Sequence, residues 1–287
     1  MSFTEELQSF MGSHPFKNME IEGKVFQYLL CGNENSSCTL CYFVGGTGNP
    51  LGWYRHVLSM EENYRILLVD YPMGEDRVEP MTALIGALIE RLHIDKAVWI
   101  GASFGGYMAQ LMARTYADKT EALVLYATTA LTEKGIGDLQ KQYHYVGFLL
   151  WLMEHFPYGI LKALTMKPMM KRLIPKGDSQ QDACLRGFIQ WIYEGYTREM
   201  DLHMTRLRAD LVNLRPVTEQ QLSYLKGRVL LILPEQDRAF TEEMQQGLIS
   251  LMQDPLVLSA EGGHLATLTH AEEFAEKTRC FLQNIGL

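Results

Sequence analysis

Runs of apolar, often β-branched residues alternate with segments of helical periodicity along this chain. The runs are "TLCYFV" from residue 39, "YRILLVD" from 64, "KAVWIG" from 96, "EALVLYA" from 121, "RVLLIL" from 228 and "PLVLS" from 255. Such runs are typical of parallel strands buried on both faces. Between two of them, Met81, Leu84, Leu88 and Leu92 mark one face of a helix. The alternation therefore predicts an α/β fold, a mostly parallel sheet flanked by helices.

Residues 19–31, "MEIEGKVFQYLLC", have a different pattern. Apolar and polar side chains alternate on both sides of Gly23, which predicts two short antiparallel strands. Together with the six runs, they predict a sheet of eight strands.

The strand–helix alternation is suspended between the strands near 121–126 and 229–233. This segment is dense in Trp, Met, Phe and Tyr and contains no convincing strand. We expect a helical cap over 131–222, inserted into a core made of 1–130 and 223–287. Most of its aromatic and methionine side chains should be ordinary core. Its methionines would also suit an adaptable apolar pocket wall, namely Met153, Met166, Met169, Met170, Met200 and Met204.

Composition limits the partners and the cellular location. The 287 residues can bury a large core, and the formal net charge of -8 argues against nucleic acid. The first residues, "MSFTEELQSFMG", are acidic and lack the apolar region of a signal peptide. Five cysteines are an odd number, which fits a reducing compartment. A cytoplasmic protein is expected.

Two other features do not predict special chemistry. The most apolar stretch, "YVGFLLWLMEHFPYGILKALTM", is interrupted by Glu154, Pro157 and Lys162 before the roughly 20 residues that a membrane span needs, so we expect buried helix or lid. Cys38 and Cys41 form a C-x-x-C, but residues three apart on a strand point to opposite faces. No metal site and no redox site is predicted.

The segment "GASFGG", residues 101–106, joins a predicted strand to a predicted helix with almost no loop. Gly101 and Gly105 remove the side chains that would collide where the strand and the helix cross. Such a turn pushes the hydroxyl of Ser103 out at the carboxyl edge of the sheet, and the helix N-terminus directs free N–H groups to the same place. G-x-S-x-G is a weak signal alone, but here strand, turn and helix support it.

A neutral serine needs a base to take its proton, and the base needs a carboxylate to orient it. Asp237 follows the strand at 228–233, and His264 lies on a glycine-bearing loop after the last strand. The order Ser, acid, His fits this architecture. Glu235 lies on the same loop as Asp237 and stays an alternative acid. His270 is expected inside the final helix, and the remaining histidines follow no late strand. Asp70 is expected to be structural.

The attacked carbonyl also needs donors for its developing negative charge. The backbone N–H of Phe104 is one candidate. We expect a second from the loop "VGGTGNPLGWY", because its glycines let the main chain approach a substrate closely.

These motifs resemble the α/β-hydrolase superfamily over residues 18–284. The resemblance implies that Ser103 attacks, His264 moves the proton, Asp237 holds the imidazole, and water completes turnover without a cofactor. The turn at residues 101–105 corresponds to the nucleophile elbow of this superfamily. A serine at the elbow disfavours the haloalkane dehalogenase and epoxide hydrolase branches, which use aspartate there. Gly45-Gly46 replaces the family's usual His-Gly, which leaves Gly46 and Thr47 as alternative second donors. After the fourth strand, "DYPMGED" replaces the family's usual D-x-R-G-x-G-x-S, which alters the loop beside the pocket entrance.

Two classes of function follow. The first is a cofactor-free serine hydrolase, by default a carboxylesterase, that cleaves a small-to-medium apolar ester, thioester, amide or activated C–C bond. The same residues would also serve perhydrolysis. The second is a non-catalytic binding protein, because "DYP" with "LHIDKAVWIGASFGGYMAQLMA" is similar to maspardin-like proteins. The sequence leaves the oligomeric state open, a homodimer included.

Overall fold

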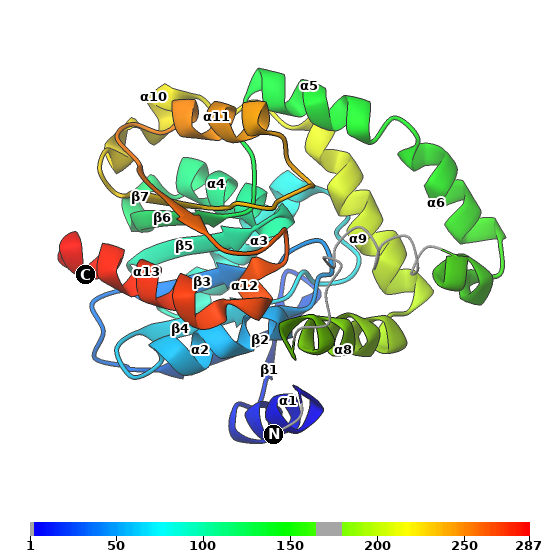
Figure 1. Cartoon of the computed structure of the whole chain (residues 1–287), viewed down its shortest axis with the longest axis horizontal. Helices are drawn as coiled ribbons and strands as arrows, with labels where there is room; N and C mark the ends of the chain where they lie inside the picture. Colours follow the sequence, from blue (N-terminus) through cyan, green and yellow to red (C-terminus); the bar gives the residue numbers. More distant parts are fainter. Residues whose placement is uncertain (1–2, 165–179) are drawn as a thin grey trace.

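A computed structural model describes residues 3–164 and 180–287, and its centre is one eight-stranded sheet (Figure 1). The strand order is β1-β2-β4-β3-β5-β6-β7-β8. β1 and β2 are antiparallel to each other, β2 is antiparallel to β4, and the remaining neighbours are parallel. This confirms the predicted mostly parallel sheet. The strands are β1 (Lys17–Ile21), β2 (Lys24–Gly32), β3 (Thr39–Phe43), β4 (Arg65–Val69), β5 (Ala97–Ala102), β6 (Thr120–Tyr126), β7 (Val229–Pro234) and β8 (Leu256–Ala260).

Helices cover both faces of the sheet. Figure 1 shows α2 and α13 on one face and α3 and α4 on the other. The middle strands β3 and β5 are buried along their whole length, as the apolar runs predict. The helices are α1 (Phe3–Ser13), α2 (Tyr54–Met60), α3 (Val78–Arg91), α4 (Phe104–Thr115), α5 (Glu133–Gln142), α6 (Val146–His155), α8 (Gln180–Gly195), α9 (Arg198–Asp210), α10 (Glu219–Leu222), α11 (Glu242–Leu251), α12 (Ala266–Thr269) and α13 (Ala271–Asn284).

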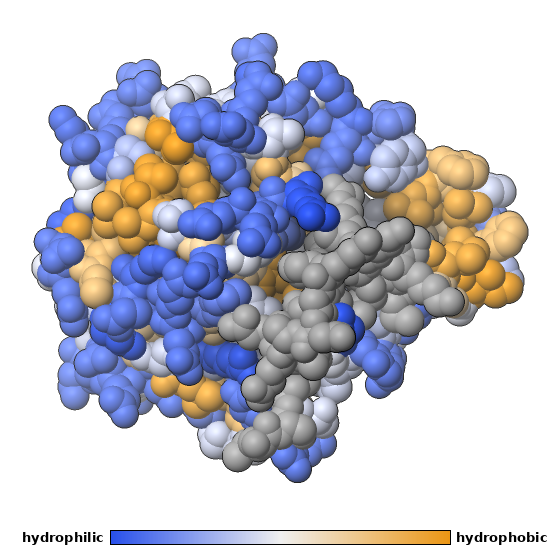
Figure 2. All heavy atoms as spheres, in the orientation of Figure 1, coloured by the Kyte–Doolittle hydropathy of each residue, from blue (hydrophilic) through white to orange (hydrophobic). Residues whose placement is uncertain are grey.

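The segment between β6 and β7, here called the insertion, contains α5, α6, α8, α9 and α10 and no strand among its described residues. The predicted helical character is therefore confirmed for this part. For the stretch that contains α6, the sequence predicts a buried helix or a lid, and a buried helix is not observed. Of the residues of α6 only Met153 is buried, and Phe148 and Trp151 are 65% and 50% exposed. Figure 2 shows the resulting apolar patch at the α6 end of the molecule.

No helix in the described ranges is both long and apolar enough to cross a membrane. Helix α6 is apolar but has ten residues, whereas a span needs about 20.

The "DYPMGED" loop, residues 70–76, holds helix α9 of the insertion. His203 is buried and makes hydrogen bonds to Asp76 Oδ1 at 2.7 Å and to Tyr71 O at 3.2 Å. The carboxylate of Asp210, at the end of α9, accepts from the N–H of Val78 at 2.8 Å, the first residue of α3. That carboxylate supplies an acceptor at a helix start, where N–H groups have no intrahelical partner. The residues Tyr71 and Asp76 of this loop thus fix α9 of the insertion to the core through His203.

Asp70 begins the same loop and ties it to β2. Its Oδ1 accepts from the N–H of Gln27 at 2.9 Å. Burial raises the pKa of its carboxyl to about 7, although this hydrogen bond opposes the rise. The contact supports the structural role expected for Asp70.

Candidate active site

The turn between β5 and α4 places Ser103 in an unusual backbone conformation. β5 ends at Ala102, α4 begins at Phe104, and Ser103 between them has φ 53° and ψ -121°. A Cβ atom on Gly101 would lie 2.1 Å from Gly105 O, and one on Gly105 would lie 2.1 Å from Phe43 O. Only glycine fits at these positions, because both neighbours are backbone atoms. The chain can therefore turn within one residue and project the hydroxyl from the sheet edge.

His264 brings an imidazole to this hydroxyl from the loop after β8. Its Nε2 lies 3.0 Å from Ser103 Oγ, across 161 positions of sequence. The ring of Phe240 packs against it in an edge-on arrangement, with ring centroids 5.2 Å apart. The imidazole is thus within proton-transfer distance of the serine and has little freedom to leave it.

Asp237 contacts the opposite side of the same imidazole. His264 Nδ1 lies 3.0 Å from Asp237 Oδ2 and 3.2 Å from Oδ1. The Asp237 side chain is 0% exposed, and its Oδ1 also accepts from the N–H of Ala239 at 2.7 Å. An ionised carboxylate only accepts, so Nδ1 carries the proton and leaves Nε2 free to accept from the Ser103 hydroxyl.

The acid loop and the histidine loop are joined by their backbones. The N–H of Glu235 donates to Ala260 O, and the N–H of Gln236 donates to Gly262 O, each at 3.0 Å. The residue Glu235 itself is exposed. Of the two acids considered, the structure therefore places Asp237 against His264.

Other histidines lie elsewhere. His56 is fully buried in the core and donates from Nε2 to Thr267 O at 3.0 Å. Burial lowers its pKa to about 4. His203 holds α9, and His270 lies between α12 and α13, as the N-cap of α13 and not within it. None of these three is paired with Ser103.

The loop after β3 passes directly beside Ser103. A Cβ atom on Gly45 would lie 3.5 Å from Ala102 O and 4.0 Å from Ser103 Cβ. The Tyr71 hydroxyl donates to Val44 O at 2.9 Å and steadies the start of this loop. Phe104 is the first residue of α4, so its N–H has no acceptor within the helix. The expected donor from α4 and the expected donor loop thus both lie beside the serine.

Two residues of α9 cover this loop, and the sequence analysis did not predict the role of either. A Cβ atom on Gly48 would lie 2.7 Å from Met204 Sδ, and one on Gly46 would lie 3.5 Å from Arg208 Cδ. The sequence predicts a pocket wall for Met204 and no role for Arg208. Met166, Met169 and Met170, for which it predicts the same pocket wall, lie outside the described residues. The i, i+4 spacing of Met204 and Arg208 puts both on one helix face, but the sequence does not show which face meets the loop.

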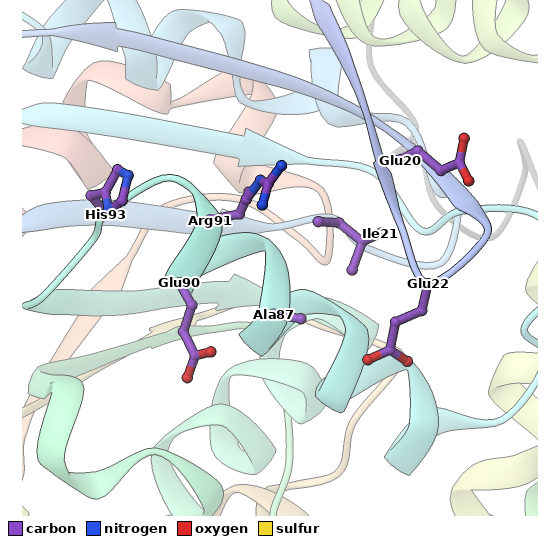
Figure 3. Close-up of a pocket in the computed structure, with 7 residues that line it drawn as sticks. All are labelled: Glu20, Ile21, Glu22, Ala87, Glu90, Arg91 and His93. Atoms are coloured by element: carbon purple, nitrogen blue, oxygen red, sulfur yellow. The ribbon is translucent and has the colours of Figure 1, made fainter.

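Further features of the described residues offer no comparable chemistry. Cys38 and Cys41 are buried free thiols, and burial raises the pKa of Cys38 to about 11. The pocket in Figure 3 lies between the β1–β2 turn and α3, and charged residues such as Glu22, Glu90 and Arg91 line it. It contains no residue of the Ser103 site.

Comparisons with known proteins show which family the sequence matches. Residues 42–277 match the model of the alpha/beta hydrolase family. Maspardin from Homo sapiens is 27% identical over 108 residues, 36% of this chain and 35% of maspardin. The match thus spans about a third of the length of these curated relatives.

Solved structures resemble nearly the whole chain. An enol-lactonase from Burkholderia xenovorans LB400 has a TM-score of 0.73 and 16% identity, over 93% of this chain and 100% of that one. A thermophilic esterase from Thermogutta terrifontis has a TM-score of 0.72 and 16% identity, over 94% and 100%. A carboxylesterase from Bacillus subtilis has a TM-score of 0.63 and 14% identity, over 98% and 97%. At such identities these likenesses concern the fold. The family model matches most of the sequence, and the chain belongs to the alpha/beta hydrolase family.

Proposed function

We propose that this chain is a serine hydrolase that cleaves a small-to-medium ester with a mainly apolar acyl group. One observation carries the proposal. The imidazole of His264 contacts Ser103 Oγ through Nε2 and the buried Asp237 carboxylate through Nδ1, both at 3.0 Å. Such a relay is the arrangement that turns a neutral hydroxyl into a nucleophile.

The reaction follows from these contacts. His264 Nε2 takes the proton of Ser103 as Oγ bonds to the ester carbonyl carbon, and the carbonyl electron pair moves to oxygen. The Phe104 N–H and one N–H from Gly46 or Thr47 stabilise this oxyanion. The tetrahedral intermediate collapses, and the alcohol leaves with the proton from His264. Water then attacks the acyl-enzyme by the same route, and the acid is released.

The insertion between β6 and β7 is proposed as a cap over this site. In this division, 1–130 and 223–287 form the hydrolase core and 131–222 form the cap. The placement of Met204 and Arg208 against the oxyanion loop supports it, because both side chains come from α9. The chemistry needs only side chains of this protein and water, so no cofactor is proposed.

A fluorophosphonate probe tests the assignment directly, because it forms a stable bond with an activated serine. We expect the wild-type protein to be labelled at Ser103, as located by peptide mass spectrometry. Ser103→Ala should not be labelled, and His264→Ala should be labelled far more slowly. Labelling at another serine, or equal labelling of wild type and His264→Ala, would contradict the assigned site.

The second candidate is a binding protein that keeps the fold without turnover. The partial similarity to maspardin favours it. It predicts an intact fold, no probe labelling at Ser103 and no ester cleavage above the Ser103→Ala background.

A further inference from the structure

Arg208 is the feature of the site that the proposed mechanism does not use. It lies on α9, one helical turn after Met204, and it reaches the loop that carries the candidate oxyanion donors. A Cβ atom on Gly46 would lie 3.5 Å from Arg208 Cδ and 3.6 Å from Nη1. Gly45, the preceding residue, is the one that borders Ser103. The guanidinium thus lies beside Gly46, the loop residue that follows the one bordering the nucleophile.

The hydrogen bonds of this guanidinium go to neutral oxygens. Its Nε donates to Met204 O at 3.1 Å, and its Nη2 donates to Thr205 Oγ1 at 2.9 Å. Among the side chains described, those of residues 4–164 and 185–287, no carboxylate oxygen lies within 4.0 Å of it. Arg206, on the same helix, is by contrast paired with Asp76 at 3.1 Å and Glu154 at 2.7 Å. Of these two arginines, the one beside Gly46 is therefore the one without an ion pair among the described side chains.

The nearby carboxylate of Asp201 interacts with the Arg208 charge without forming an ion pair with it. Asp201 lies on the same helix, beyond ion-pair distance, and its carboxylate accepts from the Tyr158 hydroxyl at 3.3 Å. Burial raises the pKa of Asp201, and the Arg208 charge opposes the rise. Among the described residues, the Arg208 charge also opposes the rise in the pKa of Tyr193 in α8 and of Tyr196 directly after it, a rise caused by burial.

A half-buried guanidinium is always ionised and is stabilised best by a planar anion that accepts two parallel hydrogen bonds. The two neutral bonds use Nε and Nη2, and Nη1 lies 3.6 Å from the place of a Cβ atom on Gly46. A substrate whose carbonyl is bound at Ser103 could place a carboxylate at this nitrogen. We propose that Arg208 is a specificity residue that binds a carboxylate of the substrate, so that the preferred substrates are esters or lactones with an acidic acyl chain. This inference rests on the proposed function and narrows its substrate class.

Matched pairs of methyl esters test the proposal. Monomethyl glutarate carries a carboxylate where methyl pentanoate carries a methyl group, and dimethyl glutarate is the neutral polar control. Monomethyl succinate and adipate vary the distance between the two ends. Acid release is followed by pH-stat titration for wild type, Arg208→Gln, Arg208→Lys and Arg198→Gln. Arg198 is a matched control, because it starts α9 and lies about 15 Å along the helix from Arg208.

For wild type we expect kcat/KM to favour the monoacid esters and the preference to weaken with added salt. Arg208→Gln should lower the ratio of kcat/KM for monoester over neutral ester by about 10–100-fold. Arg208→Lys should retain part of the preference, and Arg198→Gln all of it. An unchanged ratio in Arg208→Gln would overturn the proposal. So would an equal loss for charged and neutral esters, since that would assign Arg208 to the transition state and not to recognition.

A binding measurement separates this inference from the proposed function. Isothermal titration of Ser103→Ala with monomethyl glutarate should show binding, and Ser103→Ala/Arg208→Gln should bind at least about 10-fold more weakly. If wild type cleaves no ester but this difference is found, the catalytic proposal fails and the carboxylate site stands. If esters are cleaved but the two variants bind equally, the carboxylate site is wrong and catalysis stands.

Discussion

Nε2 of His264 lies 3.0 Å from Oγ of Ser103, although the two residues are 161 positions apart and belong to loops after different strands. Neither residue can act in the proposed reaction without the other. The Ser103 hydroxyl needs a base to become a nucleophile, and His264 can act as that base only by accepting the Ser103 proton. The contact therefore leads directly to a kinetic prediction.

Ser103→Ala and His264→Ala should each lower kcat for ester hydrolysis at least about 10³-fold. The kcat of the double variant should be no lower than the kcat of the less active single variant, because the two groups act as a unit. Circular dichroism and thermal unfolding should show an intact fold for both, since each side chain lies at the sheet edge and not in the core. A loss that multiplies in the double variant would contradict a shared role.

Asp237→Asn should lower kcat by about 10²–10⁴-fold and leave KM little changed. The asparagine amide can donate to Nδ1, which favours the imidazole tautomer that cannot accept from Ser103. Glu235→Gln is the matched control, because that residue is exposed on the same loop. A larger loss in Glu235→Gln than in Asp237→Asn would reverse the assignment of the acid.

Gly105→Ala should destabilise the protein by about 3 kcal/mol or more, or prevent folding. Its new Cβ would lie 2.1 Å from Phe43 O and 2.8 Å from Val44 O, and these backbone atoms cannot move aside without opening the sheet. Gly137→Ala in α5 has no heavy atom within 4 Å of the new Cβ, and it should be neutral or stabilising by up to about 1 kcal/mol. Chemical denaturation of both variants checks the contrast.

Asp70→Asn should change how stability depends on pH. The pKa of the Asp70 carboxyl is about 7 in the folded chain against an ordinary value of 3.8. Folding therefore favours the protonated form, and stability should fall as pH rises from about 4 to about 7. Asparagine cannot ionise and its oxygen can still accept from the Gln27 N–H. The variant should be more stable than wild type at pH 8 by about 1–3 kcal/mol.

The control for this experiment is Asp95→Asn, at an exposed position. Its unfolding free energy should follow that of wild type at every pH from 4 to 8. If Asp70→Asn were also parallel to wild type, the buried Asp70 carboxyl would not be the source of this pH dependence.

Ester hydrolysis should decrease on acidification, because an imidazolium at His264 cannot accept the proton of Ser103. The measurement is kcat/KM for a neutral methyl ester from pH 5 to pH 8, with stability monitored in parallel. A rate that stays flat over this range while the protein remains folded would exclude His264 as the base.

The order of the elements and the elbow could be read from the sequence because both depend on local physics. The apolar runs bury strands on both faces, and β3 to β8 lie where those runs are. At the elbow, Gly101 is needed because a Cβ would meet Gly105 O, which is four residues away in sequence, and the strand, turn and helix follow one another directly. The contact of Gly105 with Phe43 O of β3, in contrast, exists only in the folded chain. Helix α6 shows the limit of this reasoning. Its apolar composition predicts burial, but burial depends on having a partner surface, and Phe148 is 65% exposed.

The tertiary structure alone decided which charges meet. Glu235 and Asp237 are two residues apart on one loop, yet only the Asp237 carboxylate is paired with His264. Arg206 and Arg208 are two residues apart on α9, yet Arg206 pairs with acids while Arg208 reaches Gly46. Periodicity and the direct succession of strand, turn and helix involve neighbours in sequence, so the sequence alone can reveal them. Pairing of distant charges depends on the docking of α9 and on the two loops at the sheet edge, which only the folded chain establishes.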